Sequence, residues 1–276
     1  MKKLIIALLL LIFIVLIGVS VALVLGFDSA NPAVPAVKQG DSGSQSAEIG
    51  VMKPVDTMAD VLEELSYEIS QNSDTVGWLK VPGTTINNSV LQSHNNITYL
   101  RFNERKQEDI YGCYFADADG SIGSRDQMSV NTIIYGHSDL KDNPDGPRFS
   151  QLFKFTDESF ARQTPYIYFS TLDDYMVWEV FAVFYTDTKM QYIYPNLEND
   201  LLTDIMNKAK LKSVYNYSVQ VSESDKILTL STCTVKDKEI ADERFVIMAK
   251  LVPDGEELKV QANLEVNNDI EPPNFS

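Results

Sequence analysis

The sequence has few of the side chains that bind metal ions or form disulfides. Its 276 residues include two cysteines, Cys113 and Cys233, and two histidines, His94 and His137. No Cys/His cluster is present, so no zinc site is visible, and we expect no metal or other cofactor. The cysteines could form one disulfide in an exported protein. The alternative is a buried Cys113 thiol, because residues 111–116 look like a core strand and free cysteine is usually buried.

Positive charge is also scarce. The chain has 23 Lys and Arg residues against 39 Asp and Glu residues, and its formal net charge is -16. Binding to nucleic acid needs a basic face, so this balance argues against a nucleic-acid partner. The negative charge is consistent with an extracellular domain that an anionic membrane surface repels. The 44% hydrophobic and 22% charged content indicates that most of the chain folds as a globule.

One long hydrophobic run stands at the amino end. Lys2 and Lys3 precede an apolar stretch from Leu4 to about Phe27, which exceeds the roughly 20 residues needed to span a bilayer. The alternative is a cleaved signal peptide, but its apolar region usually has only about 7 to 15 residues. We expect residues 1–27 to be an uncleaved, single-pass anchor in the plasma membrane. The lysines predict a cytoplasmic amino end, with the rest of the chain outside the cell.

Composition divides the remaining chain into three parts. Residues 28–55 contain Pro, Gly and Ser without a periodic apolar face, which predicts a flexible extracellular linker. Residues 56–252 carry helix and strand patterns and form the predicted folded domain. Residues 253–276 are acidic and have little apolar content after Leu264, which predicts a solvated, partly disordered tail.

Hydrophobic periodicity within the folded domain predicts a mainly β fold with helices. Apolar residues at helical spacing predict one helix starting at Asp56 and another over roughly residues 198–211. Runs rich in β-branched and aromatic residues predict strands. These strands are expected at residues 77–81, 89–92, 111–116, 130–136, 166–170, 175–186, 227–234 and 244–251.

The last two predicted strands carry a thiol and a cation. The first strand ends in Cys233, a polar loop follows, and the second strand starts at Arg244. If the two strands pair, both side chains project at the same end of the sheet. A fixed cation beside a thiol favours the thiolate, which is the nucleophilic form. A third chemical group, His137, directly follows another predicted strand, whereas His94 lies in a polar loop and is expected to be exposed without a role.

These features resemble the sortases, membrane-anchored cysteine transpeptidases of Gram-positive bacteria. The family signature, Thr-Leu-x-Thr-Cys followed by an Arg that opens the next strand, reads here Thr229-Leu230-Ser231-Thr232-Cys233 and Arg244. The family's histidine at a strand end corresponds to His137. Two further segments match class B sortases, Gly77–Thr84 and Arg148–Leu152. The resemblance covers the whole predicted folded domain.

The resemblance implies a sortase-type β-barrel of mixed strands, with an N-terminal helix and a helix before the last strands. It implies that Cys233 is the nucleophile and that His137 acts first as general acid and then as base. Arg244 cannot shuttle protons, so it would hold the substrate carbonyl or stabilise the oxyanion. Ser231 and Thr232 either bind substrate or are ordinary strand residues. The enzyme would cleave a C-terminal sorting motif after Thr, form a thioacyl-enzyme and transfer the protein to an amino nucleophile.

The resemblance also implies partners. Substrates would be secreted proteins or pilins that carry a sorting motif, commonly Asn-Pro-x-Thr-x in class B. The acceptor would be a peptidoglycan precursor of the cell wall or the Lys amine of a pilin. The polar loop Asp139–Pro147, which borders the proposed site, looks longer than in class B relatives.

Four other functions compete with cell-wall anchoring. A pilin-polymerising sortase and a membrane-tethered cysteine hydrolase would use the same residues. A non-enzymatic, membrane-anchored surface-binding module predicts that Cys233 is buried away from His137 or bridged to Cys113. A papain-like protease is disfavoured because that family has its cysteine early in the chain and its histidine downstream.

Overall fold

The computed structural model describes residues 58–236 and 242–271. The predicted anchor (1–27) and linker (28–55) lie outside the described residues, and their boundaries stay predictions. Within the described part of the chain, no helix combines the length and the apolar character that a membrane crossing requires.

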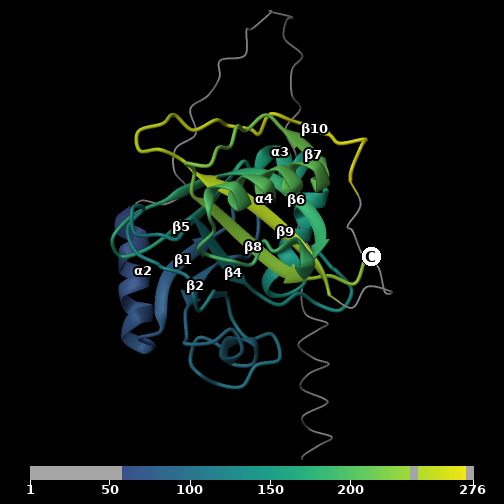
Figure 1. The fold of residues 1–276 in the computed structure, drawn as a ribbon. Coiled ribbons are helices and arrows are strands. Elements are labelled where there is room, and N and C mark those ends of the chain that lie inside the picture. The colour runs from purple at the N-terminus through teal and green to yellow at the C-terminus, as the bar shows by residue number, and fades with distance from the viewer. Residues whose placement is uncertain (1–57, 237–241, 272–276) are drawn as a thin grey trace, which may run out of the picture. The chain divides into compact units, whose positions relative to one another are not determined.

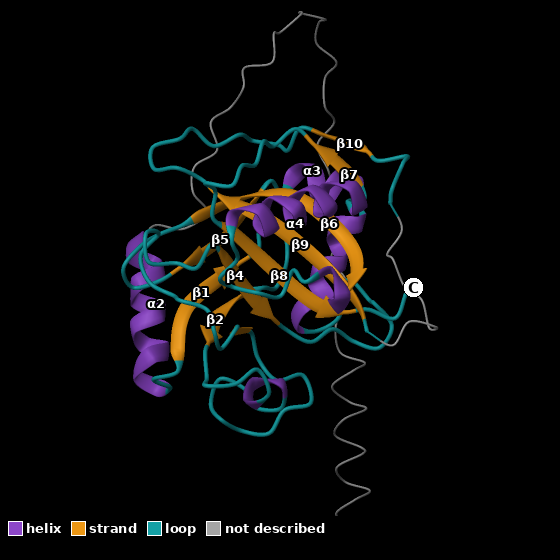
Figure 2. Cartoon of the chain, in the orientation of Figure 1, coloured by secondary structure: helices purple, strands orange, loops and turns teal. Residues whose placement is uncertain are grey.

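Eight strands of the described chain close into a barrel (Figure 2). Their order around the barrel is β1-β2-β3-β4-β8-β9-β6-β5. The β2–β3 and β4–β8 pairs are parallel, whereas β1–β2, β3–β4 and β8–β9 are antiparallel. The strands are β1 (Thr75–Lys80), β2 (Asn87–Leu91), β3 (Phe115–Ala116), β4 (Asn131–Tyr135), β5 (Tyr166–Ser170), β6 (Val177–Asp187), β8 (Ile227–Cys233) and β9 (Glu243–Leu251). The mixed β-barrel expected from the resemblance is confirmed.

Helices and a small second sheet pack around this barrel (Figure 1). Helix α2 packs against β1, and helix α4 lies across β6. The expected N-terminal helix and the helix before the last strands are therefore confirmed as α2 and α4. The elements outside the barrel are α2 (Met58–Gln71), η1 (Thr98–Leu100), η2 (Arg148–Thr156), α3 (Glu158–Gln163), η3 (Thr188–Met190), α4 (Asn199–Lys212), β7 (Tyr215–Tyr217) and β10 (Leu264–Val266).

A hydrophobic core joins all eight barrel strands. One core residue from each strand, in chain order, is Leu79, Val90, Ala116, Ile134, Ile167, Val183, Leu230 and Ile247. Strand β8 is buried along almost its whole length, and its terminal residue, Cys233, is its one exposed position. A strand that is covered on both faces has a nearly continuous run of apolar residues, which explains why apolar residues dominate the first part of β8. The core thus fixes the strand and leaves only its end to the solvent.

The strand predicted over residues 111–116 is shorter than expected. Only Phe115 and Ala116 belong to β3. Gly112 has a φ of +52°, a left-handed conformation that suits glycine and that a regular strand does not contain. The chain therefore turns at Gly112 before it enters the barrel.

The described part of the acidic tail, residues 253–271, makes specific contacts with other elements. Strand β10 pairs with β7, and Leu264 is buried. The Asn267 side-chain amide donates to the Ser213 carbonyl at 2.9 Å. These bonds and the buried leucine offset the cost of ordering a polar segment, which composition alone does not reveal. Residues 272–276 lie outside the described residues.

Replacing Leu230 by alanine tests the central position of β8 in the core. Leu230 is 0% exposed, so Leu230→Ala should lower the free energy of unfolding by about 2–5 kcal/mol through lost burial and a cavity. Urea denaturation followed by circular dichroism measures this change. The control is Leu140→Ala, because Leu140 is 87% exposed and its removal should change stability by less than about 0.5 kcal/mol. Equal effects of the two substitutions would contradict the assignment.

Candidate active site

The pairing of β8 with β9 brings a thiol and a guanidinium together. Cys233 lies directly opposite Arg244 in the antiparallel ladder. Side chains at opposite positions project to the same side of a sheet, with Cβ atoms about 4.5–5.5 Å apart. These two strands therefore pair, which is the condition under which both side chains project at the same end of the sheet.

The parallel pairing of β4 with β8 brings an imidazole to the same end of the barrel. The last pair of this ladder is Tyr135 with Ser231. His137 follows Tyr135 by two residues, just as Cys233 follows Ser231 by two residues. Three adjacent strands, in the order β4, β8 and β9, therefore deliver the imidazole, the thiol and the guanidinium to one place.

These three side chains line one pocket of about 280 Å³. Of its ten other lining residues, five are aromatic or aliphatic, four are polar and one is glycine. They are Asn96, Leu100, Phe115, Tyr135, Gly136, Thr188, Tyr192, Ile193, Ser231 and Thr232. Among the described residues, no group of three or more His, Cys, Asp or Glu side chains is arranged to hold a metal ion. The pocket therefore offers a nucleophile, an acid–base group and a fixed cation in mainly apolar surroundings.

The two cysteines differ sharply in exposure. Cys233 is exposed and free, whereas Cys113 is free and only 1% exposed. The predicted buried thiol at Cys113 is confirmed, and the alternative disulfide is wrong. Burial raises the pKa of Cys113 far above its ordinary value, so its sulfur stays a thiol. The surface-binding module required a buried or bridged Cys233, and the structure contradicts that requirement.

A backbone carbonyl orients the ring of His137. The Nε2 atom lies 3.0 Å from the Leu100 carbonyl oxygen, which accepts the N–H of that nitrogen. Burial lowers the pKa of His137 below its ordinary value of 6.5, while the Leu100 carbonyl raises it in part. Arg101 lowers the same pKa and Asp109 raises it. The imidazole is thus mainly neutral at pH 7, and the carbonyl favours the imidazolium when a proton arrives.

Arg244 reaches the pocket as a partly exposed cation. One guanidinium nitrogen, Nη1, donates to the Glu243 carbonyl at 3.0 Å, and Nη2 lies 3.9 Å from a carboxylate oxygen of Asp242. The Arg244 side chain is 24% exposed. A guanidinium carries several N–H donors and stays protonated. The group therefore presents positive charge to the pocket.

The polar segment beyond the histidine is joined to the segment that follows the thiol. The Asp142 carboxylate accepts the Thr234 hydroxyl at 2.5 Å and the Val235 backbone N–H at 3.0 Å. The Ser138 hydroxyl donates to the Cys233 carbonyl at 2.6 Å. Ser138 and Asp142 therefore hold the backbone at the carboxyl side of the nucleophile.

The two predicted substrate-binding residues both line the pocket. The Ser231 hydroxyl lies 2.9 Å from the hydroxyl of Tyr192. Burial raises the pKa of Tyr192 to about 12, so the phenol stays protonated, and the two hydroxyls form a hydrogen bond in which either can donate. The Thr232 hydroxyl is buried and has no hydrogen-bond partner in the described part of the chain. Two hydroxyl groups thus supply polarity beside the thiol.

Sequence reasoning missed three contributors to this geometry. Tyr192 lies in the aromatic-rich segment Gln191–Tyr194 between a predicted strand and a predicted helix, and that unusual composition of a loop was an available signal. Leu100 contributes a backbone carbonyl, which any residue type provides, so its identity carries no signal. Asp142 is one of several acidic residues in a polar loop and has no distinguishing neighbour in the sequence. His94, expected to be an exposed loop residue, is exposed.

The chain is similar to several known proteins. Residues 79–252 match the family described as Sortase domain. A protein described as Sortase B from Listeria monocytogenes is 38% identical over 195 residues, which are 70% of this chain and 76% of the relative. The solved Staphylococcus aureus sortase B-substrate complex has a TM-score of 0.61 and 29% identity, covering 71% of this chain and 87% of that chain. A crystal structure of Sortase B complexed with triglycine has a TM-score of 0.61 and 29% identity, with coverages of 71% and 88%.

Alkylation tests the contrast between the two thiols. Iodoacetamide should add one group to the folded protein, at Cys233, because a buried structural cysteine is inert. Mass spectrometry of the peptides locates the adduct. Cys233→Ala should remove it, and unfolding the unaltered protein in urea should expose Cys113 as a second site. An adduct on Cys113 in the folded protein would contradict the burial of the Cys113 side chain.

Proposed function

Since the chain belongs to the sortase family and is a cysteine transpeptidase of the sortase B type, we propose that Cys233 cleaves a C-terminal sorting motif after its Thr. The thiolate attacks the Thr carbonyl carbon, the peptide amine leaves, and a thioacyl-enzyme remains. An incoming amine then attacks the thioester, forms an amide and regenerates the thiol. The observation that carries this proposal is the exposed thiol at the end of β8, in one pocket with His137 and Arg244.

Each of the three groups has a chemical role in this proposal. His137 takes the proton of the Cys233 thiol, gives that proton to the leaving amine, and later takes one from the incoming amine and returns it to the sulfur. Its half-buried ring and lowered pKa suit a group that must both gain and lose a proton near neutral pH. Arg244 cannot exchange protons, so it stabilises the oxyanion of the tetrahedral intermediate or holds the carbonyl that becomes it. Ser231 and Thr232 bind the motif beside the thiol.

Two lines of support concern the substrate and the acceptor. One structure similar to this chain is a sortase B-substrate complex, and another is complexed with triglycine. We therefore expect a secreted protein with a sorting motif as the acyl donor. We expect a glycine-type amine of a peptidoglycan precursor as the first acceptor, so that the reaction anchors proteins to the cell wall. A pilin Lys amine is the second candidate.

The proposal also concerns the location of the enzyme. The apolar run from Leu4 to about Phe27 is long enough to span a bilayer, and Lys2 and Lys3 favour a cytoplasmic amino end. The catalytic domain would then work on the outer side of the plasma membrane. Its substrates arrive there by secretion, and its acceptor lies in the wall.

Substitutions at the pocket test the assigned roles. Cys233→Ala should abolish cleavage of a fluorogenic sorting peptide, because no thioacyl-enzyme can form. Arg244→Ala should lower kcat/KM by about 10²- to 10³-fold, the usual cost of one oxyanion donor. Cys113→Ala is the matched control and should retain activity, since its thiol lies outside the pocket. Full activity of Cys233→Ala would contradict the proposal.

A second experiment identifies the acceptor. The enzyme is incubated with a sorting peptide and with triglycine, a pilin Lys peptide or neither, and the products are identified by mass spectrometry. We expect an amide product with triglycine and the free acid, at a lower rate, without an amine. A product with the Lys peptide alone would favour pilus assembly. The free acid alone under all three conditions would favour the hydrolase.

A further inference from the structure

The backbone of two separate segments holds His137. The Leu100 carbonyl binds the ring, and the backbone N–H of Phe149 donates to the His137 carbonyl at 2.8 Å. Leu100 belongs to the long excursion between β2 and β3, and Phe149 lies in the first turn of η2. The backbone carbonyl of a loop residue can hold a ring in one orientation only if the loop itself is held in place. The anchors of the excursion therefore matter for the histidine.

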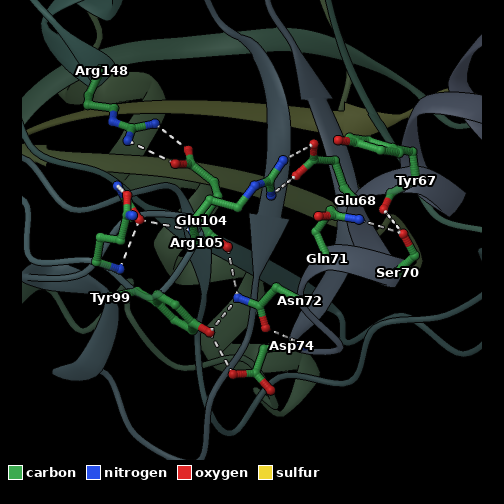
Figure 3. A network of polar contacts seen from close by, with 12 residues as sticks. Tyr67, Glu68, Ser70, Gln71, Asn72, Asp74, Tyr99, Glu104, Arg105 and Arg148 are labelled. Atoms are coloured by element: carbon green, nitrogen blue, oxygen red, sulfur yellow. Dashed lines mark hydrogen bonds and ion pairs between the residues drawn. The ribbon is translucent and has the colours of Figure 1, made fainter.

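Tyr99, the neighbour of Leu100, anchors this excursion to the segment after α2 (Figure 3). Tyr99 is 1% exposed. Its hydroxyl donates to a carboxylate oxygen of Asp74 at 2.6 Å and accepts from the Asn72 side-chain amide at 3.1 Å. The bond from Tyr99 lowers the pKa of Asp74, and burial raises the pKa of Tyr99. At neutral pH the pair is thus a carboxylate and a protonated phenol, which is a strong charge-assisted hydrogen bond.

A second link joins the two segments that hold His137. The Asn72 amide also donates to the Glu104 carbonyl at 3.1 Å. The Glu104 carboxylate forms a two-point ion pair with Arg148, with one N–O distance of 3.2 Å (Figure 3). Arg148 directly precedes Phe149, and its guanidinium lies 5.5 Å from the ring centre of Tyr114. The network thus connects the carbonyl that binds the ring with the segment that binds the histidine backbone.

We propose that Tyr99, held by Asn72 and Asp74, is a positioning residue that fixes the Leu100 carbonyl and through it the imidazole of His137. This inference rests on the proposed role of His137 in proton transfer. Tyr99 makes no contact with the reacting atoms in this scheme. The bonds of the Tyr99 hydroxyl fix the position of the Leu100 carbonyl. That carbonyl binds Nε2 of His137 and so fixes the direction in which the ring presents its other nitrogen, Nδ1.

The backbone around Tyr99 has a second support that keeps it folded without the hydroxyl. The Tyr99 carbonyl accepts the Cys113 backbone N–H at 3.1 Å. Gly112 allows this approach, since a Cβ atom there would lie 2.1 Å from the Tyr99 carbonyl oxygen. Loss of the phenol hydroxyl should therefore loosen the Leu100 carbonyl without unfolding the excursion. Tyr99→Phe, which removes one oxygen atom, is the informative change.

The test compares Tyr99→Phe with Tyr215→Phe in the full-length protein. Tyr215 is also buried, and its hydroxyl donates to the Thr156 carbonyl at 2.7 Å, so the control removes a similar bond outside the pocket. Tyr99→Phe should lower kcat for a fluorogenic sorting peptide by about 10-fold, part of the roughly 10²- to 10⁴-fold that general acid–base catalysis supplies. KM should stay nearly unchanged. Tyr215→Phe should leave both values as they are.

A second readout is independent of activity. The chain has two histidines, so NMR titration follows each ring separately, with His94→Asn to assign the signals. The titration midpoint of His137 should move to lower pH in Tyr99→Phe, because the displaced carbonyl no longer favours the imidazolium. Asp74→Asn weakens the hydrogen bond between Tyr99 and residue 74 from the acceptor side. It should therefore also move the His137 midpoint to lower pH. Tyr215→Phe should not move it.

The outcomes separate this inference from the proposed function. An unchanged His137 midpoint in Tyr99→Phe, or an equal loss of kcat in Tyr215→Phe, overturns the positioning role. Full activity of His137→Ala overturns the proposed proton transfer instead, and the midpoint still reports whether Tyr99 fixes the Leu100 carbonyl.

Discussion

Strand β8 is hydrogen-bonded along both edges, to β4 on one side and to β9 on the other, and the site depends on this double pairing. The period of a strand is two residues, so a slip of one residue in either ladder would turn Cys233 to the opposite face. The six residues of β8 before Cys233 are all buried, so a slip would disrupt the packing on both faces of the strand. The same apolar contacts that stabilise the barrel therefore set the direction of the thiol.

Loops complete the site by a different kind of bond. Ser138 binds the Cys233 carbonyl, and Asp142 binds Thr234 and the backbone beyond it. The Leu100 carbonyl reaches His137 from another loop. Each of these bonds joins a side chain to a segment far away in the sequence. The barrel supplies the register of the reacting groups, and the side-chain bonds supply their final orientation.

The difference between the barrel and the loops also explains which features of the site could be predicted from the sequence. The runs of β-branched and aromatic residues predicted the strands β8 and β9, and the Cys and Arg at the strand ends marked the site. The Leu100 carbonyl left no trace in the sequence, because every residue has a backbone carbonyl. The order of the tail depended on distant partners such as Ser213, which composition does not disclose. The short β3 followed from the backbone conformation of one residue, Gly112.

The parallel β4–β8 pair has a consequence for the way the protein folds. It joins Asn131 to Ile227, so a long stretch of chain must be enclosed before the pair forms, and such distant contacts slow folding. The thiol gains its cationic neighbour only when the still later β9 has paired. The pocket therefore cannot be complete until the last barrel strand in the sequence has been synthesised and has paired with β8. A chain truncated before Glu243 would keep the cysteine and the histidine but would lack the strand that places the guanidinium beside the thiol.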